Sequence, residues 1–459
     1  MSNVEILTLS GTKKKGLLRI IFSRILVILL LILLQISLWV SVYGWFQEYL
    51  PHFSVITSLF TLVMFVYLFN ASMDASAKIT WLFIMSLAPI PSSIFLAYTK
   101  SNLGHRLIRK RVEALTQENM HLIPQDEQVM EALEKDRNGT DDLCRYVART
   151  GCYPVFQNTE VTYYPLGEEK FRDMLEELSK AEHYIFMEYF IVQEGYMWGR
   201  ILKILAEKAK AGVDVRVMYD GMCEITLLPH NYPKLMEQEG IKCKAFSPLT
   251  PFLSTHYNNR DHRKILVIDG KVAFNGGVNL ADEYINHIQV YGHWKDTAVR
   301  LRGNAAASFA LMFLQMWNID EKEPEFEKFL YPVGSSGEKA QFSGYVMPYA
   351  DCPLDGEKVG ESVYIDILYR ANDYVHIMTP YLILDGELET ALKYAAQRGV
   401  DVKLILPGIP DKITAYALAK THYHELVKAG VQIYEYTPGF VHAKVFVSDN
   451  EKAVVGTIN

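Results

Sequence analysis

A chain of 459 residues, half of them hydrophobic, is long enough for two or three domains with substantial cores. Residues 1–111 hold 11 of the 46 Lys/Arg and 3 of the 53 Asp/Glu, a net charge of +8, which leaves 35 basic and 50 acidic residues, a net charge of −15, in the remainder. So acidic a surface argues against sustained contact with a nucleic-acid backbone. The five cysteines show no C-x-x-C spacing and indicate neither a disulfide framework nor a zinc site.

The first 100 residues contain three uncharged windows of 21 residues: Ile25–Trp45, Phe53–Met73 and Ile79–Thr99. Each is long enough to cross a hydrocarbon core, which needs roughly 20 apolar residues. The first is apolar on every face, which argues against a buried helix of a soluble protein. No A-x-A cleavage site of a signal peptide follows it. These windows predict a multi-pass membrane protein.

Basic residues flank this region at both ends, and the positive-inside rule places both flanks in the cytoplasm. Three full crossings would instead separate them. Pro89 and Pro91 can break a helix in the third window. We therefore expect a membrane region at residues 1–100 and a cytoplasmic catalytic domain in the cell membrane. The expected spans lie at about 25–45 and 53–73, with a third segment at 79–99 that spans or re-enters the bilayer.

The remainder of the chain shows an internal repeat. Residues 101–154 are expected to begin as a charged helix and continue as a polar linker or lid. From Val155 onward, short apolar strands alternate with helix-period segments, which is typical of an α/β domain. Three pairs of segments match in the same order and at nearly constant offset: Met187–Val192 with Thr379–Leu384, Gly212–Arg216 with Gly399–Lys403, and Gly240–Pro248 with Gly430–Pro438. We expect two similar βαβ-rich halves, at 155–335 and 336–459, forming a bilobal domain.

A fourth match pairs two copies of one polar motif, H-x-K-x4-D followed by a Gly-rich turn and Asn. The two copies consist of His262, Lys264, Asp269 and Asn279, and of His442, Lys444, Asp449 and Asn459. A single copy could be no more than a strand with a polar start and a turn at its end. Two copies with identical internal spacing, in corresponding places, indicate a shared active site.

Strand geometry predicts how each copy is used. Side chains two residues apart project from the same face of a strand, so the His and Lys of each copy point together. An Asp-Gly turn makes a hairpin that returns the Asn near the start of the first strand. The aspartates have the opposite parity and lie at the far end, where we expect them to organise the site electrostatically. If the halves face each other, the site holds two imidazoles, two ammoniums and two amides.

These groups suit the transfer of a phosphodiester. Ammoniums and amides stabilise charge that spreads onto the equatorial oxygens of phosphorus. One imidazole can attack phosphorus while the other acts as general acid for the leaving alcohol. No metal or other cofactor is expected, because the lysines supply the charge and the sequence shows no carboxylate cluster.

The two motifs resemble those of the phospholipase D superfamily, and with the N-terminal windows the chain is most similar to bacterial cardiolipin synthases. The resemblance includes Ile185–Gly195, Arg260–Glu283, His293–Asp296 and Thr379–Tyr381. It implies transfer of a phosphatidyl group between two phosphatidylglycerol molecules, giving cardiolipin and glycerol through a phosphohistidine. It also implies that His262 is the nucleophile. Asp296 resembles the position that orients a catalytic histidine, with a surface salt bridge as the alternative.

Other polar residues near the expected cleft have a structural interpretation beside the functional one. Glu188 is a candidate substrate contact or a core residue. His256 and Arg260 precede the first motif and either line the pocket or belong to a solvated loop. The remaining histidines of the α/β region are not expected to be catalytic: His183, His230, His287, His376, His422 and His424.

Three other functions are compatible with the same motifs. A phospholipase D-type hydrolase would use water as the acceptor, and a site that opens onto the bilayer disfavours it by excluding water. A membrane-tethered nuclease is poorly supported by the acidic soluble region, and no nucleic-acid partner is expected. The intact His and Lys of both motifs argue against an inactive scaffold. The basic stretch His105–Arg111 is expected to hold the acidic domain at an anionic membrane.

Asn459 is the last residue of the sequence as well as the last residue of the second motif. In the first half the chain continues seventeen residues beyond Asn279 to reach Asp296, and the family's pattern continues past this Asn. We therefore interpret the sequence as a C-terminally truncated form in which His442 lacks an orienting carboxylate and the strand Lys452–Gly456 is uncovered. Such a chain is expected to be marginally stable and nearly inactive, in contrast to a longer form.

Overall fold

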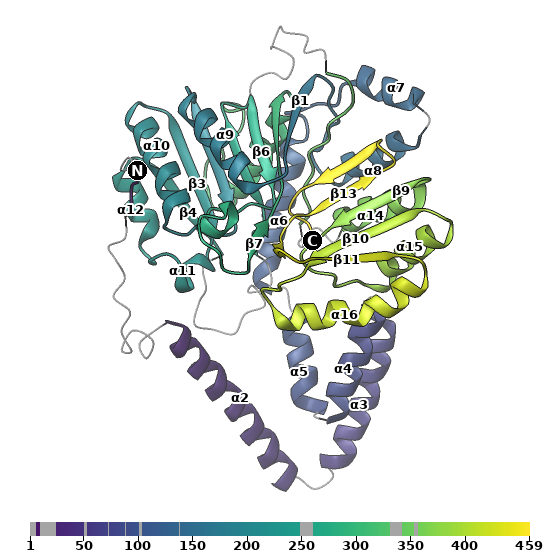
Figure 1. The fold of residues 1–459 in the computed structure, drawn as a ribbon. Helices are drawn as coiled ribbons and strands as arrows, with labels where there is room; N and C mark the ends of the chain where they lie inside the picture. The colour runs from purple at the N-terminus through teal and green to yellow at the C-terminus, as the bar shows by residue number, and fades with distance from the viewer. Residues whose placement is uncertain are drawn as a thin grey trace. The chain divides into compact units, whose positions relative to one another are not determined.

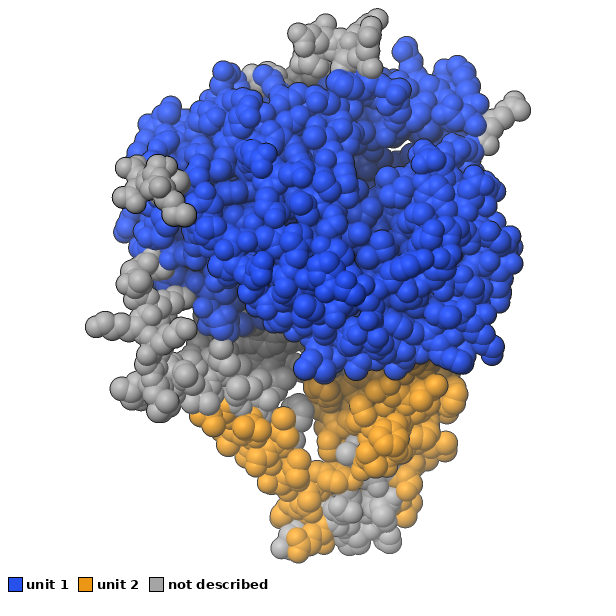
Figure 2. Space-filling model, viewed as in Figure 1, with its two compact units in different colours: residues 1–11, 108–248, 260–459 blue, residues 12–107, 249–259 orange. Residues whose placement is uncertain are grey.

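The computed structural model describes residues 6–9, 24–49, 53–71, 73–87, 89–100, 103–136, 138–247, 260–330, 342–352 and 357–459. His256, one of the candidate pocket residues, lies outside these residues. The chain divides into two compact units, coloured separately in Figure 2. Residues 1–11, 108–248 and 260–459 form the larger unit, and residues 12–107 and 249–259 form the smaller one.

The smaller unit contains α2 (Arg24–Tyr49), α3 (Phe53–Asn70), α4 (Ala75–Leu87) and α5 (Pro89–Lys100) (Figure 1). The third predicted window is divided between α4 and α5, because proline is tolerated at the start of a helix and not in its interior. Leu68, Met85 and Leu96 come from three different helices and form a small buried core. Within the described residues, no helix combines the length and apolar character that crossing a membrane requires, and the predicted spans are not confirmed.

The larger unit contains two mixed α/β sheets, of which the first has seven strands. In order across the sheet they are β1 (Thr159–Tyr164), β8 (Ala298–Gly303), β6 (Val272–Gly276), β5 (Lys264–Ile268), β2 (Tyr184–Tyr189), β3 (Asp214–Asp220) and β4 (Lys242–Phe246). The pairs β2–β3 and β3–β4 are parallel, and the other neighbours are antiparallel. Every residue of β2 is buried, as expected for a strand covered on both faces.

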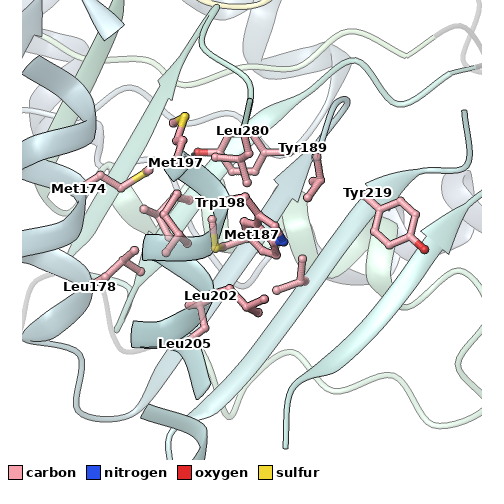
Figure 3. Packing of buried hydrophobic residues seen from close by; sticks show 14 of the residues in the cluster. Met174, Leu178, Met187, Tyr189, Met197, Trp198, Leu202, Leu205, Tyr219 and Leu280 are labelled. Carbon is pink, nitrogen blue, oxygen red and sulfur yellow. Dashed lines mark hydrogen bonds between the residues drawn. The ribbon is translucent and has the colours of Figure 1, made fainter. Parts of the chain in front are cut away.

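Helices on both faces fix the central strand β2. On one face, α9 (Gly167–Ser179) and α10 (Tyr196–Lys210) pack through residues such as Trp198 and Leu202 against Met187 of β2 (Figure 3). On the other face lies α13 (Ala306–Trp317), whose Phe313 stacks on Phe186 with ring centroids 4.6 Å apart. Alternate residues of β2 therefore enter two different close-packed cores.

The second sheet has five strands: β11 (Gln432–Tyr436), β10 (Asp401–Pro407), β9 (Tyr374–Met378), β13 (Val445–Ser448) and β14 (Lys452–Val455). Their order reproduces β4-β3-β2-β5-β6 of the first sheet, with the same parallel and antiparallel pairs. Three helices bury apolar residues against it: α14 (Val359–Arg370), α15 (Gly386–Gln397) and α16 (Ile413–Lys428). The repeat seen in the sequence is therefore a repeat of strand order in two α/β lobes (Figure 1).

The segment predicted as a linker at 101–154 contains α6 (Leu103–Asn119), α7 (Glu127–Lys135) and α8 (Thr140–Thr150). Val147 of α8 is buried in the core of the second sheet, and Leu115 of α6 is buried in the core shared with α13. Phe156 and Val346 exchange two backbone hydrogen bonds of 2.8 and 2.9 Å. This segment therefore packs against both lobes.

A short parallel ladder joins the two lobes. β7 (His293–Lys295) pairs with β12 (Gly439–Val441). Gly439 permits this approach, because a Cβ atom there would lie 2.2 Å from the carbonyl oxygen of His293. The chain continues from β7 into Asp296, and from β12 into His442, whose amide donates to the Lys295 carbonyl at 2.8 Å. The ladder thus brings side chains from the two lobes into one site.

Candidate active site

Each copy of the polar motif forms an arm in which the lysine bonds its own histidine. Lys264 Nζ donates to the carbonyl oxygen of His262 at 2.6 Å, and Lys444 Nζ donates to that of His442 at 2.5 Å. Both lysine side chains are almost fully buried. The contact follows from the i, i+2 spacing, which places His and Lys on the same side of an extended segment. The two arms therefore present their side chains in the same way.

His442 is held by a carboxylate from the other lobe. Its Nδ1 lies 2.7 Å from Oδ2 of Asp296, which is completely buried, and Oδ1 of Asp296 accepts from the Thr297 amide at 2.8 Å. Because a carboxylate accepts hydrogen bonds, Nδ1 carries the proton and Nε2 is left to exchange protons. The expectation that His442 lacks a carboxylate is wrong, because Asp296 acts across the lobes and not on the histidine of its own half. The prediction that the chain is nearly inactive depended on that missing carboxylate and loses its reason.

His262 is held by a neutral backbone group. Its Nδ1 lies 3.1 Å from the carbonyl oxygen of Thr457, so Nδ1 donates and Nε2 keeps its lone pair. The ring also lies against Phe190, with centroids 5.0 Å apart. Each histidine is thus oriented through Nδ1 by a residue of the opposite lobe, but only His442 is oriented by a charge.

Burial and the neighbouring lysines keep both imidazoles neutral. Burial, followed by the charge of Lys444, lowers the pKa of His442 to about 4, although Asp296 acts in the opposite direction. Burial and the charges of Lys264 and Lys444 hold the pKa of His262 far below its ordinary value. A neutral His262 is a competent nucleophile near neutral pH.

The other charges of the site are perturbed by the same burial. Burial lowers the pKa of Lys444 to about 7 and holds that of Lys264 well below its ordinary value, with the charge of Lys444 adding to the effect on Lys264. Burial would raise the pKa of Asp296, but His442, Lys444 and the Thr297 amide together hold it below its ordinary value. Perturbed groups gathered at one junction are characteristic of a functional site. An anionic ligand would favour the charged form of both lysines and of His442.

Asp269 and Asp449 hold the backbone at the far end of their strands. Asp269 accepts from the amides of Glu182, His183 and Tyr184, each at 2.8 Å. Asp449 accepts from the amides of Asn372, Asp373 and Tyr374, at 2.8 to 3.0 Å. Both aspartates have positive φ, 52° and 55°, at the turn after the strand. Five residues of strand place Asp269 roughly 16 Å from Lys264, so neither aspartate joins the His and Lys cluster.

The two motif asparagines also differ in their surroundings. Asn279 is buried, with Oδ1 accepting from the Ile191 amide at 3.1 Å and Nδ2 donating to the Tyr284 hydroxyl at 2.8 Å. Its amide therefore ties the loop after β6 to the loop after β2. Asn459 is exposed. The predicted pair of substrate-facing amides is not observed, because the Asn279 amide is already bonded within the protein and Asn459 is exposed.

Glu188 faces away from the cluster. In the β2–β5 pair it lies opposite Ile265, whereas Lys264 lies opposite Tyr189, so Glu188 and Lys264 are on different faces. Glu188 is fully buried, 3.7 Å from Arg263, and burial followed by the charge of Asp261 raises its pKa well above the ordinary value. Arg260 pairs with Asp220 at 3.2 Å. The structure supports the core interpretation of Glu188 over the substrate contact.

Two parts of the cluster have no sequence signal that would have revealed them. Thr457 contributes only a backbone carbonyl. Lys170 of α9 is fully buried behind the site, 3.4 Å from the Tyr189 hydroxyl, although a lysine on an amphipathic helix is normally assigned to the exposed face. Both positions depend on how the lobes close, which local patterns do not specify.

Among the described residues, one carboxylate cluster could hold a metal ion: Glu361, Asp385 and Glu387. Lys358 already bonds these side chains, with Nζ at 2.8, 3.1 and 3.5 Å. Asp385 is also the N-cap of α15 and accepts from the Leu388 amide. This cluster is therefore accounted for by its own lysine.

The repeated lobe and the paired arms define a phospholipase D-like protein. A family model described as "Cardiolipin synthase, PLD-like domain" matches residues 174–317 and 364–459, together more than half of the chain. The cardiolipin synthases of Halalkalibacterium halodurans and Alkalihalophilus pseudofirmus are 31% and 32% identical, each alignment covering 95% of this chain and 87% of the relative. The chain therefore belongs to the cardiolipin synthase family of phospholipase D-like proteins.

Two further similarities add no role for individual residues. A Streptococcus mutans protein described as uncharacterized is 56% identical over 86% of this chain and 85% of its own length. Among solved structures, phosphatidylserine synthase of Haemophilus influenzae aligns with 63% of this chain and 76% of its own, at 14% identity and a TM-score of 0.46. That likeness is too distant to support an argument.

Proposed function

We propose that this protein is a cardiolipin synthase, a phosphatidyltransferase that joins two phosphatidylglycerol molecules and releases glycerol. The observation that carries the proposal is the pair of imidazoles, each bonded through Nδ1 to the opposite lobe, between two buried lysines. Relatives named cardiolipin synthase at 31–32% identity over most of the chain support the choice of lipid.

In the first half-reaction, Nε2 of His262 attacks the phosphorus of one phosphatidylglycerol. The bond from phosphorus to the headgroup glycerol breaks, and protonated His442 gives that oxygen its proton, so glycerol leaves and a phosphatidyl-histidine remains. The substrate anion and Asp296 both favour the proton on His442 before this step. Lys264 and Lys444 stabilise the charge on the equatorial oxygens.

In the second half-reaction, neutral His442 takes the proton of a headgroup hydroxyl on a second phosphatidylglycerol. The resulting alkoxide oxygen attacks phosphorus, the phosphorus–nitrogen bond to His262 breaks, and cardiolipin forms. The same residues act in both half-reactions, so the identity of the product depends on which acceptor reaches the phosphatidyl-histidine. A lipid acceptor competes with water only if the site excludes water.

The proposal includes a place at the cell membrane, because donor, acceptor and product are all lipids. Support comes from the apolar N-terminal helices, whose exposed side chains include Leu59 at 64% and Phe69 at 69%. The net charge of +8 over residues 1–111 suits an anionic lipid surface. A cytoplasmic orientation of the larger unit is proposed from the positive-inside rule. A C-terminal reporter that is active only in the cytoplasm tests this orientation, and silence of that reporter contradicts it.

The decisive assay uses the purified chain in vesicles of labelled phosphatidylglycerol with a chelator present. We expect cardiolipin and glycerol in equal amounts, no product with His262→Ala, and no loss with the chelator. Phosphatidic acid as the main product would instead identify a hydrolase. Activity that vanishes with chelator would contradict the metal-free mechanism.

A further inference from the structure

Lys170, in the first turn of α9, is a buried cation that the proposed reaction does not use. Its side chain is 0% exposed, and its Nζ lies 3.4 Å from both the Tyr189 hydroxyl and the Val278 carbonyl oxygen. Both distances exceed the usual range for N–H···O hydrogen bonds. The described residues supply no carboxylate within ion-pair distance of Nζ. A buried ammonium with such weak partners is costly unless a charge nearby compensates for it.

Within the described residues, Asp296 is the one carboxylate whose charge acts on Lys170. Its negative charge favours the charged form of the lysine. Two acidic residues of α9 itself are engaged elsewhere, because Asp173 pairs with Arg300 at 2.7 Å and Glu177 with Arg302 at 2.9 Å. Titratable groups near Lys170 include Tyr189 of β2, whose hydroxyl lies 3.4 Å from Nζ, and two groups whose charges interact with that of Lys170, namely Lys264 of β5 and Asp296 after β7. Lys170 thus belongs to the charge cluster of the active site.

A chain of close contacts also connects Lys170 to His442. Lys170 Nζ contacts the carbonyl oxygen of Val278 at 3.4 Å, and the neighbouring Gly277 donates its amide to the Thr297 carbonyl at 3.0 Å. A Cβ atom at Gly277 would lie only 2.0 Å from Oδ1 of Asp296, so this loop rests directly on the carboxylate that orients His442. Movement of the loop would therefore move Asp296.

We propose that Lys170 is a third active-site lysine, a positioning residue that holds the Gly277–Asn279 loop against Asp296 and tunes the charge of the Asp296–His442 pair and of Lys264. It lies outside the segments matched by the family model, which begin at residue 174. The inference rests on the proposed function only for the choice of substrate, because its test can follow transfer or hydrolysis equally.

The charge of Lys170 and those of its neighbours shift one another's pKa values. Burial lowers the pKa of Lys170 to about 8, and its positive charge in turn contributes to the lowered pKa of Lys264. Removing that charge favours the protonated form of every neighbour, so the pKa values of Lys264, Asp296 and His442 all rise. Two charged groups roughly 10 Å apart in a partly shielded site shift each other's pKa by about one unit.

The test is the pH profile of kcat/KM for the full chain with phosphatidylglycerol vesicles, comparing wild type with Lys170→Met. Methionine keeps the length and apolar stem of lysine. We expect a lower maximum and a displacement of both limbs to higher pH by about one unit. The matched control is Lys208→Met, which removes the same charge from the same lobe. Lys208 Nζ bonds the Ala181 carbonyl at 2.9 Å, before β2 and therefore roughly 20 Å from the site end of that strand.

A lower maximum without displacement, in a Lys170→Met protein that unfolds like the wild type, would overturn the proposal. So would an equal displacement in Lys208→Met. If Lys170→Met does not fold, the same pH profile is measured on Tyr189→Phe. This variant removes the hydroxyl that is one of the two partners of Lys170 Nζ and keeps the aromatic ring in the core. Loss of that partner makes Lys170 neutral more often, so the profile should move in the same direction by a smaller amount, and an unmoved profile contradicts the proposal. Absence of cardiolipin from the wild-type reaction would refute the proposed function and leave this comparison measurable on the hydrolysis product.

Discussion

The two H-x-K arms share one geometry and differ in the partner of the histidine. In both, the lysine bonds the histidine carbonyl and a distant aspartate holds the hairpin against the sheet. The Nδ1 of His442 meets a buried carboxylate, whereas that of His262 meets a backbone carbonyl. A carboxylate stabilises an imidazolium and a carbonyl does so far less.

This difference separates the roles of two residues that the sequence makes equivalent. A general acid and base must gain and lose a proton in each cycle, which suits His442 with Asp296 behind it. A nucleophile must stay neutral, which suits His262 with its neutral partner and its strongly lowered pKa. Each histidine depends on the opposite lobe, so neither lobe alone contains a complete site.

The largest expected effects come from the histidines themselves. His262→Ala should remove both turnover and the covalent intermediate, because the other imidazole, His442, is oriented by Asp296 for proton transfer. His442→Ala should slow turnover by about 10²- to 10⁴-fold, the usual contribution of a general acid. It should still form the intermediate slowly from a substrate whose leaving group is already acidic. Rapid-quench assays on both variants measure this difference, and an intermediate that survives only in His262→Ala would reverse the roles.

Asp296→Asn should be nearly as damaging as loss of His442. The amide cannot stabilise the imidazolium and can favour the wrong tautomer, a change that costs up to about 10⁴-fold in serine protease triads. The loss should fall on kcat more than on KM, because Asp296 supports a proton transfer and does not bind the lipid. Steady-state kinetics with the folded variant check this, and activity within a few-fold of wild type would show that His442 does not need its carboxylate.

The two distant aspartates should affect stability unequally. Asp269→Ala removes three amide bonds in a mostly buried setting and should lower the free energy of unfolding by about 2–4 kcal/mol. Asp449→Ala should cost less, about 1–2 kcal/mol, because two of its three bonds are exposed. Urea unfolding of the two variants measures the ordering. Equal losses, or a larger loss at Asp449, would contradict the link between burial and the strength of these bonds.

Asp449 also predicts a dependence of stability on pH. Burial alone would raise its pKa, but the amides of Tyr374, Asn372 and Asp373 hold it below the ordinary value. A carboxyl whose folded pKa is lowered stabilises the fold above its unfolded pKa of about 4, and the contribution disappears as pH falls through the folded value. The difference in stability between wild type and Asp449→Ala should therefore shrink below about pH 4. A difference that is constant from pH 7 to pH 3 would count against this assignment.

The smallest effect on turnover is expected at Glu188. Because Glu188 lies on the opposite face of β2 from Lys264 and has a raised pKa, Glu188→Gln should change kcat/KM by no more than a few-fold. Ionising Glu188 in the folded protein is unfavourable, so the variant should gain stability relative to wild type as pH rises above about 5. Thermal unfolding from pH 5 to pH 8 measures this. A large loss of kcat/KM with unchanged stability would restore Glu188 as a substrate contact.

Much of the fold followed from patterns that are local in the sequence. The repeat of H-x-K-x4-D and the Gly-Val-Asp-Val strands predicted two α/β lobes, because strand period and turn residues leave a direct trace. The pairing of His and Lys within each arm was predictable for the same reason. Pro89 likewise marked the boundary between α4 and α5.

The sequence did not predict the contacts that residues of the site make with other elements, above all the contacts from one lobe to the other. Asp296 was expected to serve its own half, but the β7–β12 ladder directs it to His442. Asn279 was expected to face substrate, but its amide is occupied by Ile191 and Tyr284. The partners of a side chain depend on how packed elements close on one another, and sequence spacing within one element does not contain that information.

The most direct test of this account is to locate the covalent intermediate. Phosphatidylglycerol labelled in the phosphate is mixed with the full chain, the reaction is quenched within one turnover, and the labelled residue is identified by peptide mapping under conditions that preserve phosphohistidine. We predict label on His262, no label in His262→Ala, and accumulated label in Asp296→Asn when the leaving group is acidic. Label on His442, or turnover with no labelled histidine at any quench time, would contradict it.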